Sequence, residues 1–84
     1  MVKRLKNERP KIVSILAKRI KQIVIKKGLV QKNVAHDANI DVENLRKYIK
    51  GEQEMKIGML FRISKSLGIT MSELLKDIEK DIDK

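Results

Sequence analysis

The sequence predicts a compact all-α domain of five helices, and two features of the chain support that prediction. Apolar side chains recur at three- and four-residue spacing in five separate runs, which is the periodicity of a helix that buries one face. Glycine or asparagine follows four of these runs, and both residues readily adopt the left-handed conformation that ends a helix. The expected helices span residues 10–27, 31–38, 42–50, 57–67 and 71–80.

Length and composition indicate one small domain. The 84 residues are 42% hydrophobic and include no Trp, so the domain should be modestly stable, because a chain of this size buries only about 60–65% of its unfolded surface. There is no cysteine, which excludes a disulfide framework and a thiolate metal site. No apolar run approaches the ~20 residues that span a bilayer. No signal-peptide segment is visible, so we expect a cytoplasmic protein without a membrane partner.

Positive charge is concentrated at the front of the chain. The formal net charge is +9, and residues 1–27 hold ten Lys or Arg against Glu8 alone. Residues 71–84 hold three Lys against five Asp or Glu. This asymmetry is typical of a polyanion binder whose acidic end points away from the phosphates. The expected organisation is a flexible basic arm over 1–9, the main domain over 10–76 and an acidic helical tail over 77–84.

The first expected helix begins at Pro10, whose missing donor costs nothing in a first turn, and ends at Gly28. Ile15 and Ile25 lie off its apolar stripe, and this surplus apolar surface motivates the hypothesis of a homodimer. The stripe comprises Ile12, Val13, Leu16, Ile20, Ile23 and Val24, and a second apolar seam that could serve a dimer comprises Leu75, Ile78 and Ile82.

Residues 31–51 are predicted to form two short helices joined by a tight turn. Asn39 tolerates the left-handed conformation that ends the first helix, and Asp41 is a strong N-cap for the second. Ala35 is small where two helices must cross closely. Two short helices, a turn of three to four residues and a polar second helix describe a helix-turn-helix. Val34, Ala35, Ala38, Leu45, Tyr48 and Ile49 form its apolar faces, and Glu43, Asn44, Arg46, Lys47 and Lys50 form an outward polar row.

The remaining helices follow a loop. Gly68 closes the helix over 57–67. Thr70 and Glu73 have the spacing of a capping box, and Ile69 and Leu74 have that of a hydrophobic staple. The last helix is therefore expected to begin directly after Thr70.

No catalytic constellation is visible in the sequence. His36 is the only histidine and lies in the middle of an expected helix, where we expect an exposed or half-exposed side chain. The four glycines lie at helix ends and at Gly58, and they make no phosphate-cradling loop. We therefore expect neither an enzyme nor a bound cofactor or metal.

Several of these residues occur together in the order and spacing of a known family. They are Gly28, Leu29, Gln31, Ala35, Ile40, Leu45, Gly51 and the run from Ile63 through Leu67, Gly68, Ile69, Thr70 and Glu73 to Leu74. From Leu16 to about Leu75 the chain thereby resembles the lambda-repressor-like, Cro-type helix-turn-helix domains of the xenobiotic-response-element (XRE) family. The resemblance implies a five-helix fold with its helix-turn-helix at 31–50, in a transcriptional regulator, expected to be a repressor, that binds double-stranded DNA.

The resemblance also implies which residues touch DNA. The helix over 42–50 would enter the major groove with its N-terminal half toward the base edges. Gln31 matches a family glutamine that grips a phosphate at the start of the preceding helix. The implied base readers are Val42 for a thymine methyl, Glu43 for cytosine, Asn44 for adenine and Lys47 for guanine. The further phosphate contacts would be Lys32, Arg46, Lys50 and Lys56.

Some family positions are occupied differently here. Val30 and Lys56 stand where the family usually caps a helix, and the loss of such a cap costs about 1 kcal/mol. Glu52 and Glu54 stand where a basic residue often grips phosphate, and they would repel it. These departures keep a second class open. It is a helix-turn-helix module for protein contact, such as an antitoxin or the regulatory component of a larger complex, with weak or no DNA binding.

One departure involves two positions at once. Many family members bury an arginine of the first helix against a glutamate near the end of the recognition helix, and the matching residues here are Val24 and Ile49. Exchanging both charges for apolar side chains can be neutral or stabilising, whereas exchanging one costs about 3–5 kcal/mol. We therefore predict that Val24 and Ile49 touch in the core.

Overall fold

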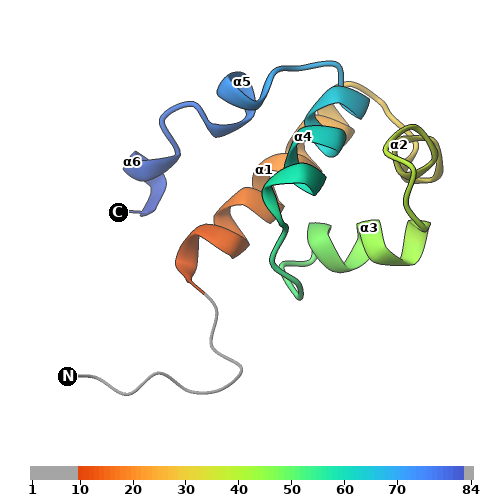
Figure 1. The fold of residues 1–84 in the computed structure, drawn as a ribbon. Coiled ribbons are helices and arrows are strands. Elements are labelled where there is room, and N and C mark those ends of the chain that lie inside the picture. The colour runs from red at the N-terminus through yellow and green to blue at the C-terminus, as the bar shows by residue number, and fades with distance from the viewer. Residues whose placement is uncertain (1–9, 83–84) are drawn as a thin grey trace.

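The computed structural model describes residues 10–82, which form α-helices and no β-strand (Figure 1). The all-α fold class is confirmed, while the arm predicted over 1–9 lies outside the described residues. Within 10–82, no helix has both the length and the apolar character needed to cross a membrane. The helices are α1 Lys11–Lys26, α2 Gln31–Asp37, α3 Val42–Ile49, α4 Ile57–Ser66, α5 Met71–Leu75 and α6 Ile78–Ile82.

A single hydrophobic core joins the helices around α1. Figure 1 shows α2 and α3 on one side of α1, and α5 and α6 on the other. Each of these helices contributes a buried apolar side chain, and α1, α3, α4 and α5 each contribute one that is fully buried. These fully buried residues are Ile20, Leu45, Ile63 and Leu74. The apolar stripes predicted from helical spacing supply most of the buried side chains, but Ile12 of the α1 stripe is 38% exposed.

The first four helices end in the same way. The residue after each C-cap has a positive φ, and the N–H that follows it donates to a carbonyl five residues earlier, as Leu29 N–H does to the Val24 oxygen at 2.9 Å. This pattern closes a helix by satisfying carbonyls that have no partner inside it. The four residues are Gly28, Asn39, Gly51 and Gly68, with φ of 64°, 58°, 74° and 76°.

The last expected helix, over 71–80, is divided in two, and the expectation of one continuous helix was wrong. Lys76 leaves the helical conformation, and Asp77 has a φ of 56°, so the chain turns between α5 and α6. The helical spacing of Leu75, Ile78 and Ile82 could not predict this turn, because the spacing of apolar residues carries no information about the backbone conformation of Lys76 and Asp77 between them.

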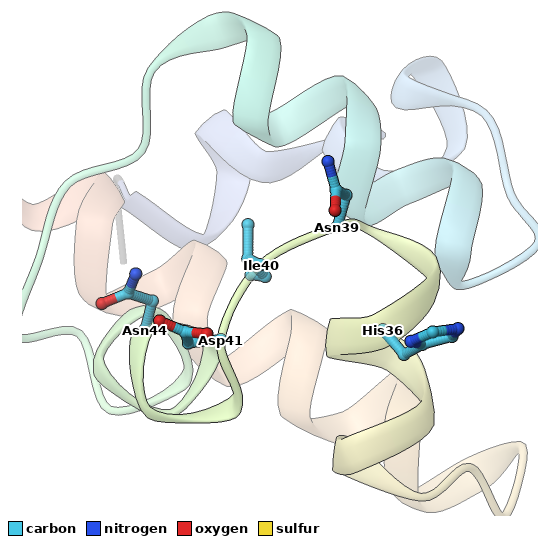
Figure 2. Close-up of a pocket in the computed structure, with 5 residues that line it drawn as sticks. All are labelled: His36, Asn39, Ile40, Asp41 and Asn44. Atoms are coloured by element: carbon cyan, nitrogen blue, oxygen red, sulfur yellow. The ribbon is translucent and has the colours of Figure 1, made fainter.

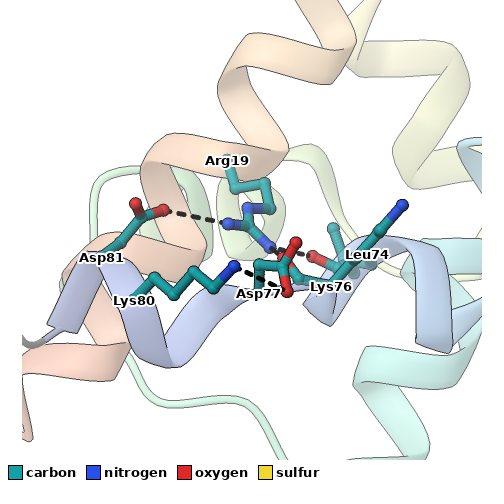
Figure 3. A network of polar contacts seen from close by, with 6 residues as sticks. All are labelled: Arg19, Leu74, Lys76, Asp77, Lys80 and Asp81. Atoms are coloured by element: carbon teal, nitrogen blue, oxygen red, sulfur yellow. Dashed lines mark hydrogen bonds and ion pairs between the residues drawn. The ribbon is translucent and has the colours of Figure 1, made fainter.

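Arg19 on α1 holds both sides of this break (Figure 3). Its Nη1 donates to the carbonyl oxygens of Leu74 at 3.0 Å and Lys76 at 2.6 Å, and its Nη2 donates to Asp81 Oδ2 at 2.9 Å. α6 accordingly folds back onto α1, and Ile78, the first residue of α6, is buried. Of the apolar seam proposed for a dimer, Ile78 is buried inside the protomer, whereas Leu75 and Ile82 are half-buried.

Two N-caps were predicted from the sequence. The cap of α5 is formed as predicted, whereas that of α3 has the predicted residue without the predicted hydrogen bond. Thr70 and Glu73 form the predicted capping box, with the Glu73 N–H donating to Thr70 Oγ1 at 3.0 Å and the Thr70 N–H donating to Glu73 Oε1 at 3.2 Å. Asp41 occupies the N-cap of α3, but its side chain makes no capping hydrogen bond. Val30 and Lys56 occupy the N-caps of α2 and α4 without a side-chain cap, as their chemistry requires.

Replacing Val30 by serine is expected to stabilise the domain by about 1 kcal/mol, because the hydroxyl can accept from the first turn of α2. Val30 has the extended backbone of an N-cap and is 57% exposed, so little packing is lost. Urea denaturation measures the effect. Val30→Ala, which also removes the valine side chain but cannot cap, is the matched control. Equal midpoints for the serine and alanine variants would contradict the prediction.

Val24 and Ile49 are both buried in the same core cluster, at the interface where α1 packs against α3. Ile25, the neighbour of Val24, points outward and is 68% exposed. Ile15 is half-buried. Both positions that carry a charge in many family members are thus apolar and buried here. The direct contact of Val24 with Ile49 stays a prediction.

Candidate nucleic-acid interface

The α2–turn–α3 unit has the geometry that the sequence predicts for a helix-turn-helix. Four residues, 38–41, connect the two helices, and Asn39 takes the left-handed conformation in the turn. The buried Ala35 and Ala38 allow α2 to pack closely against α3, which buries Leu45. The unit is thereby fixed to the core along one side, and α3 leaves its polar side exposed.

The predicted base readers do not all share the same exposure. Glu43, Asn44 and Lys47 are exposed on α3, whereas Val42 is half-buried and packs partly against the core. A side chain that reads a base edge must project beyond the helix surface. Asn44 and Lys47 meet this requirement, and Val42 has only part of its methyl surface available.

Glu43 and Arg46 form an ion pair along α3, three residues apart. Both side chains are largely exposed, so the pair adds little to stability. Its consequence concerns binding: a predicted base reader and a predicted phosphate contact neutralise one another in the free protein. Sequence reasoning placed both residues on the outward row without pairing them.

The other predicted phosphate contacts lie at or beside the ends of α2, α3 and α4. Gln31 is the first residue of α2 and is half-buried, while Lys32 beside it is exposed. Lys50 is the C-cap of α3 and Lys56 the N-cap of α4, and both are exposed. Exposed amines at the ends of neighbouring helices can reach phosphates on either side of a helix in a groove.

A polar hollow of about 340 Å³ lies at the turn of the helix-turn-helix (Figure 2). Figure 2 shows Asp41 and Asn44 close together at the start of α3, whereas His36 projects from α2 on the opposite side. His36 is exposed, as expected. Among the described residues, no group of three or more His, Cys, Asp or Glu could hold a metal ion.

Sequence reasoning missed Arg62 of α4, whose guanidinium donates to the carbonyl oxygens of Ala38 and Asn39 in the turn. Nothing in the spacing of α4 distinguishes this arginine from a solvated one, because its two partners lie more than 20 residues away. Only the packing of α4 against α2 brings them together.

A helix-turn-helix whose second helix is anchored on one side and polar on the other is the arrangement found in DNA-binding helix-turn-helix domains. Residues 19–80 match the family of Cro/C1-type HTH DNA-binding domains, and the chain belongs to this family. It is a family of DNA-binding modules, not of enzymes, which agrees with the expectation from sequence. No curated protein matches the chain.

Solved structures of gene regulators have the same fold at low sequence identity. The restriction-modification controller protein C.Esp1396I, solved as a tetramer with its natural 35 base-pair operator, gives a TM-score of 0.81 at 24% identity, covering 90% of this chain and 100% of that chain. The clp gene regulator ClgR from C. glutamicum gives 0.78 at 16% identity, covering 87% and 95%. The controller protein C.AhdI from Aeromonas hydrophila gives 0.70 at 19% identity, covering 74% and 94%. These similarities establish the shared fold.

Proposed function

We propose that the protein is a sequence-specific transcriptional regulator, acting as a repressor, that reads the major groove of double-stranded DNA with α3. The observation that supports this best is the exposed pair Asn44 and Lys47 on the outer side of α3, in a chain of the Cro/C1-type family. A helix with its side chains is about 10–12 Å across, and the major groove is about 12 Å wide. The formal net charge of +9 favours association with a polyanion.

The proposal assigns different tasks to the residues of this surface. Asn44 would pair with adenine and Lys47 would donate to guanine, while Val42 would offer its exposed methyl surface to thymine. Glu43 would accept from cytosine. The phosphate contacts would be Gln31, Lys32, Arg46, Lys50 and Lys56, which fix the orientation of α3 without reading sequence.

Removing the charge of Glu43 should raise non-specific DNA affinity, because a carboxylate near phosphates repels them. A carboxylate that also reads a base should in addition lose that base preference. In Glu43→Gln the negative charge is lost and Arg46 is released from its ion pair. We expect tighter non-specific binding, a salt dependence steeper by up to about one unit, and loss of preference for cytosine at one position. Titrations against the preferred and a scrambled duplex measure both effects. Tighter binding with unchanged sequence preference would show that Glu43 does not read a base.

The experiment that tests the proposed function is selection of binding sites from random duplex DNA at two salt concentrations. A recurring half-site should be enriched, and affinity should fall as salt rises, because bound phosphates release their counterions. Recovery of unenriched sequence at both concentrations would contradict sequence-specific binding.

A homodimer on DNA is part of the proposal, since a two-fold dimer places two recognition helices about 34 Å apart, one turn of the duplex. Ile25, one of the residues that motivated the dimer, is 68% exposed on α1 and supports this part of the proposal. Ile78 of the predicted seam is buried, whereas Ile57 and Phe61 on α4 are 72% and 50% exposed and lie one helical turn apart. Palindromic selected sites, together with a dimer mass on such a site, would support this part.

The exposed Ile57 and Phe61 also favour the second candidate function, a protein-interaction module such as an antitoxin or regulatory subunit. A hollow of about 480 Å³ adjoins Ile57, between the loop after α3 and α4. Capture of a defined protein partner, with no DNA binding at moderate salt, would favour this function. A cytoplasmic location and the division into arm 1–9, domain 10–76 and tail 77–84 remain parts of the proposal.

A further inference from the structure

Arg62 connects α4 to the turn of the helix-turn-helix. Its Nε donates to the carbonyl oxygen of Ala38 at 2.9 Å, and its Nη2 donates to the carbonyl oxygen of Asn39 at 2.7 Å. One planar guanidinium therefore binds two consecutive carbonyls, because its N–H donors are held in a rigid, forked arrangement. The side chain is half-buried at the contact between α4 and α2.

The two carbonyls belong to the residues that redirect the chain. Ala38 is the C-cap of α2, and Asn39 has the left-handed φ of 58°. The N–H groups of Asn39 and Ile40 donate back to carbonyls of α2, at His36 and Ala35. The last carbonyls of a helix have no partner inside it. In this turn the N–H groups of Asn39 and Ile40 are thus satisfied by carbonyls of α2. The carbonyl oxygens of Ala38 and Asn39 are satisfied by Arg62.

The turn leads directly into α3, whose first residue, Val42, packs partly against the core. Asp41 occupies the N-cap of α3 but makes no side-chain capping hydrogen bond. Figure 2 shows Ile40 between Asn39 and Asn44, and all three residues line the hollow at the turn. Asn44 follows Asn39 by only five residues, so a change in the backbone at Asn39 shifts the side chains proposed to read bases.

We propose that Arg62 is a positioning residue for DNA recognition, which fixes the turn so that α3 is preorganised for the groove. This inference rests on the proposed function of α3. Arg62 acts through the carbonyls of Ala38 and Asn39 and not by binding phosphate, so its effect differs from that of Lys50 or Lys56. Preorganisation improves affinity by reducing what must be ordered on binding.

The test uses Arg62→Met and Arg62→Lys, with Lys65→Met as the matched control. Lys65 is an exposed cation on the same helix, positioned over the Phe61 ring. In the free protein, amide exchange of Ile40 should accelerate in Arg62→Met but not in the control. The N–H of Leu29, which closes α1 through the same bond pattern, is the internal reference. In Arg62→Lys, which keeps the charge and loses the fork, exchange should be intermediate.

DNA binding gives the second readout, with the enriched duplex and a random-sequence duplex as probes. Arg62→Met should weaken binding to the enriched duplex about tenfold relative to Lys65→Met, with no difference between the two variants on random DNA. Their salt slopes should be equal. A slope shallower by about one unit in Arg62→Met would indicate a direct phosphate contact and overturn the inference.

Failure of this inference can be distinguished from failure of the proposed function. Unchanged Ile40 exchange in Arg62→Met, measured without DNA, overturns the role of Arg62 in fixing the turn while leaving DNA binding by α3 intact. A wild-type protein that enriches no duplex overturns the proposed function and the recognition role together. If Arg62→Met does not fold, Arg62→Lys decides: wild-type exchange and wild-type affinity in that variant overturn the inference.

Discussion

Val24→Arg is expected to lower the free energy of unfolding by about 3–5 kcal/mol, because it places an unpaired charge in the core. Val24 is 4% exposed and shares a core cluster with Ile49, which is 7% exposed. The double variant Val24→Arg with Ile49→Glu should recover part of the loss, since the two charges can then pair. Urea denaturation of the wild type, both single variants and the double variant gives the coupling free energy.

The matched control for this cycle is Ile25→Arg, the same exchange one residue along α1. Ile25 is 68% exposed, so its replacement should change stability by no more than about 0.5 kcal/mol. Additive effects of Val24→Arg and Ile49→Glu would show that the two positions do not contact one another. A loss in Ile25→Arg as large as that in Val24→Arg would show that the cost arises from added charge on α1 and not from burial.

Asn44→Ala and Lys47→Ala are each expected to weaken binding to the selected site by about 1–3 kcal/mol and to relax its sequence at one position. Both side chains are exposed on the outer side of α3, where a groove-bound helix presents its base readers. Repeating the site selection with each variant identifies the base that is no longer specified. Titration against the original site measures the loss of affinity.

Lys50→Ala provides the contrast within the same helix region, because Lys50 is proposed to bind phosphate. It should weaken binding to selected and random duplexes alike and make the salt slope shallower by about one unit. If none of the three substitutions changes DNA affinity, α3 does not lie in the groove, and the protein-interaction function becomes the better explanation.

The turn and the tail illustrate why some local predictions succeed and others fail. The prediction that Asn39 ends α2 is confirmed, because asparagine tolerates the left-handed φ that closes a helix. The break at Asp77 was not predicted, because Arg19, which holds it, comes from α1 more than 50 residues away. Asp41 is the N-cap residue of α3, as predicted, but its side chain makes no capping hydrogen bond. The sequence predicts where a helix begins, whereas the conformation of a side chain also depends on the surrounding structure.

The sequence by itself determined the fold class, the first four helices, the helix ends at Gly28, Gly51 and Gly68, and the outward polar row of α3. These features follow from spacing along one chain segment, which fixes both the buried face and the residues that close it. Only the tertiary structure decided how basic and apolar side chains are used. Arg19 and Arg62 bind backbone carbonyls of distant segments, Arg46 pairs with Glu43, and Ile78 is buried while Ile57 is not. A cation or an isoleucine has the same chemistry at every site, so its partner depends on which helix packs against it.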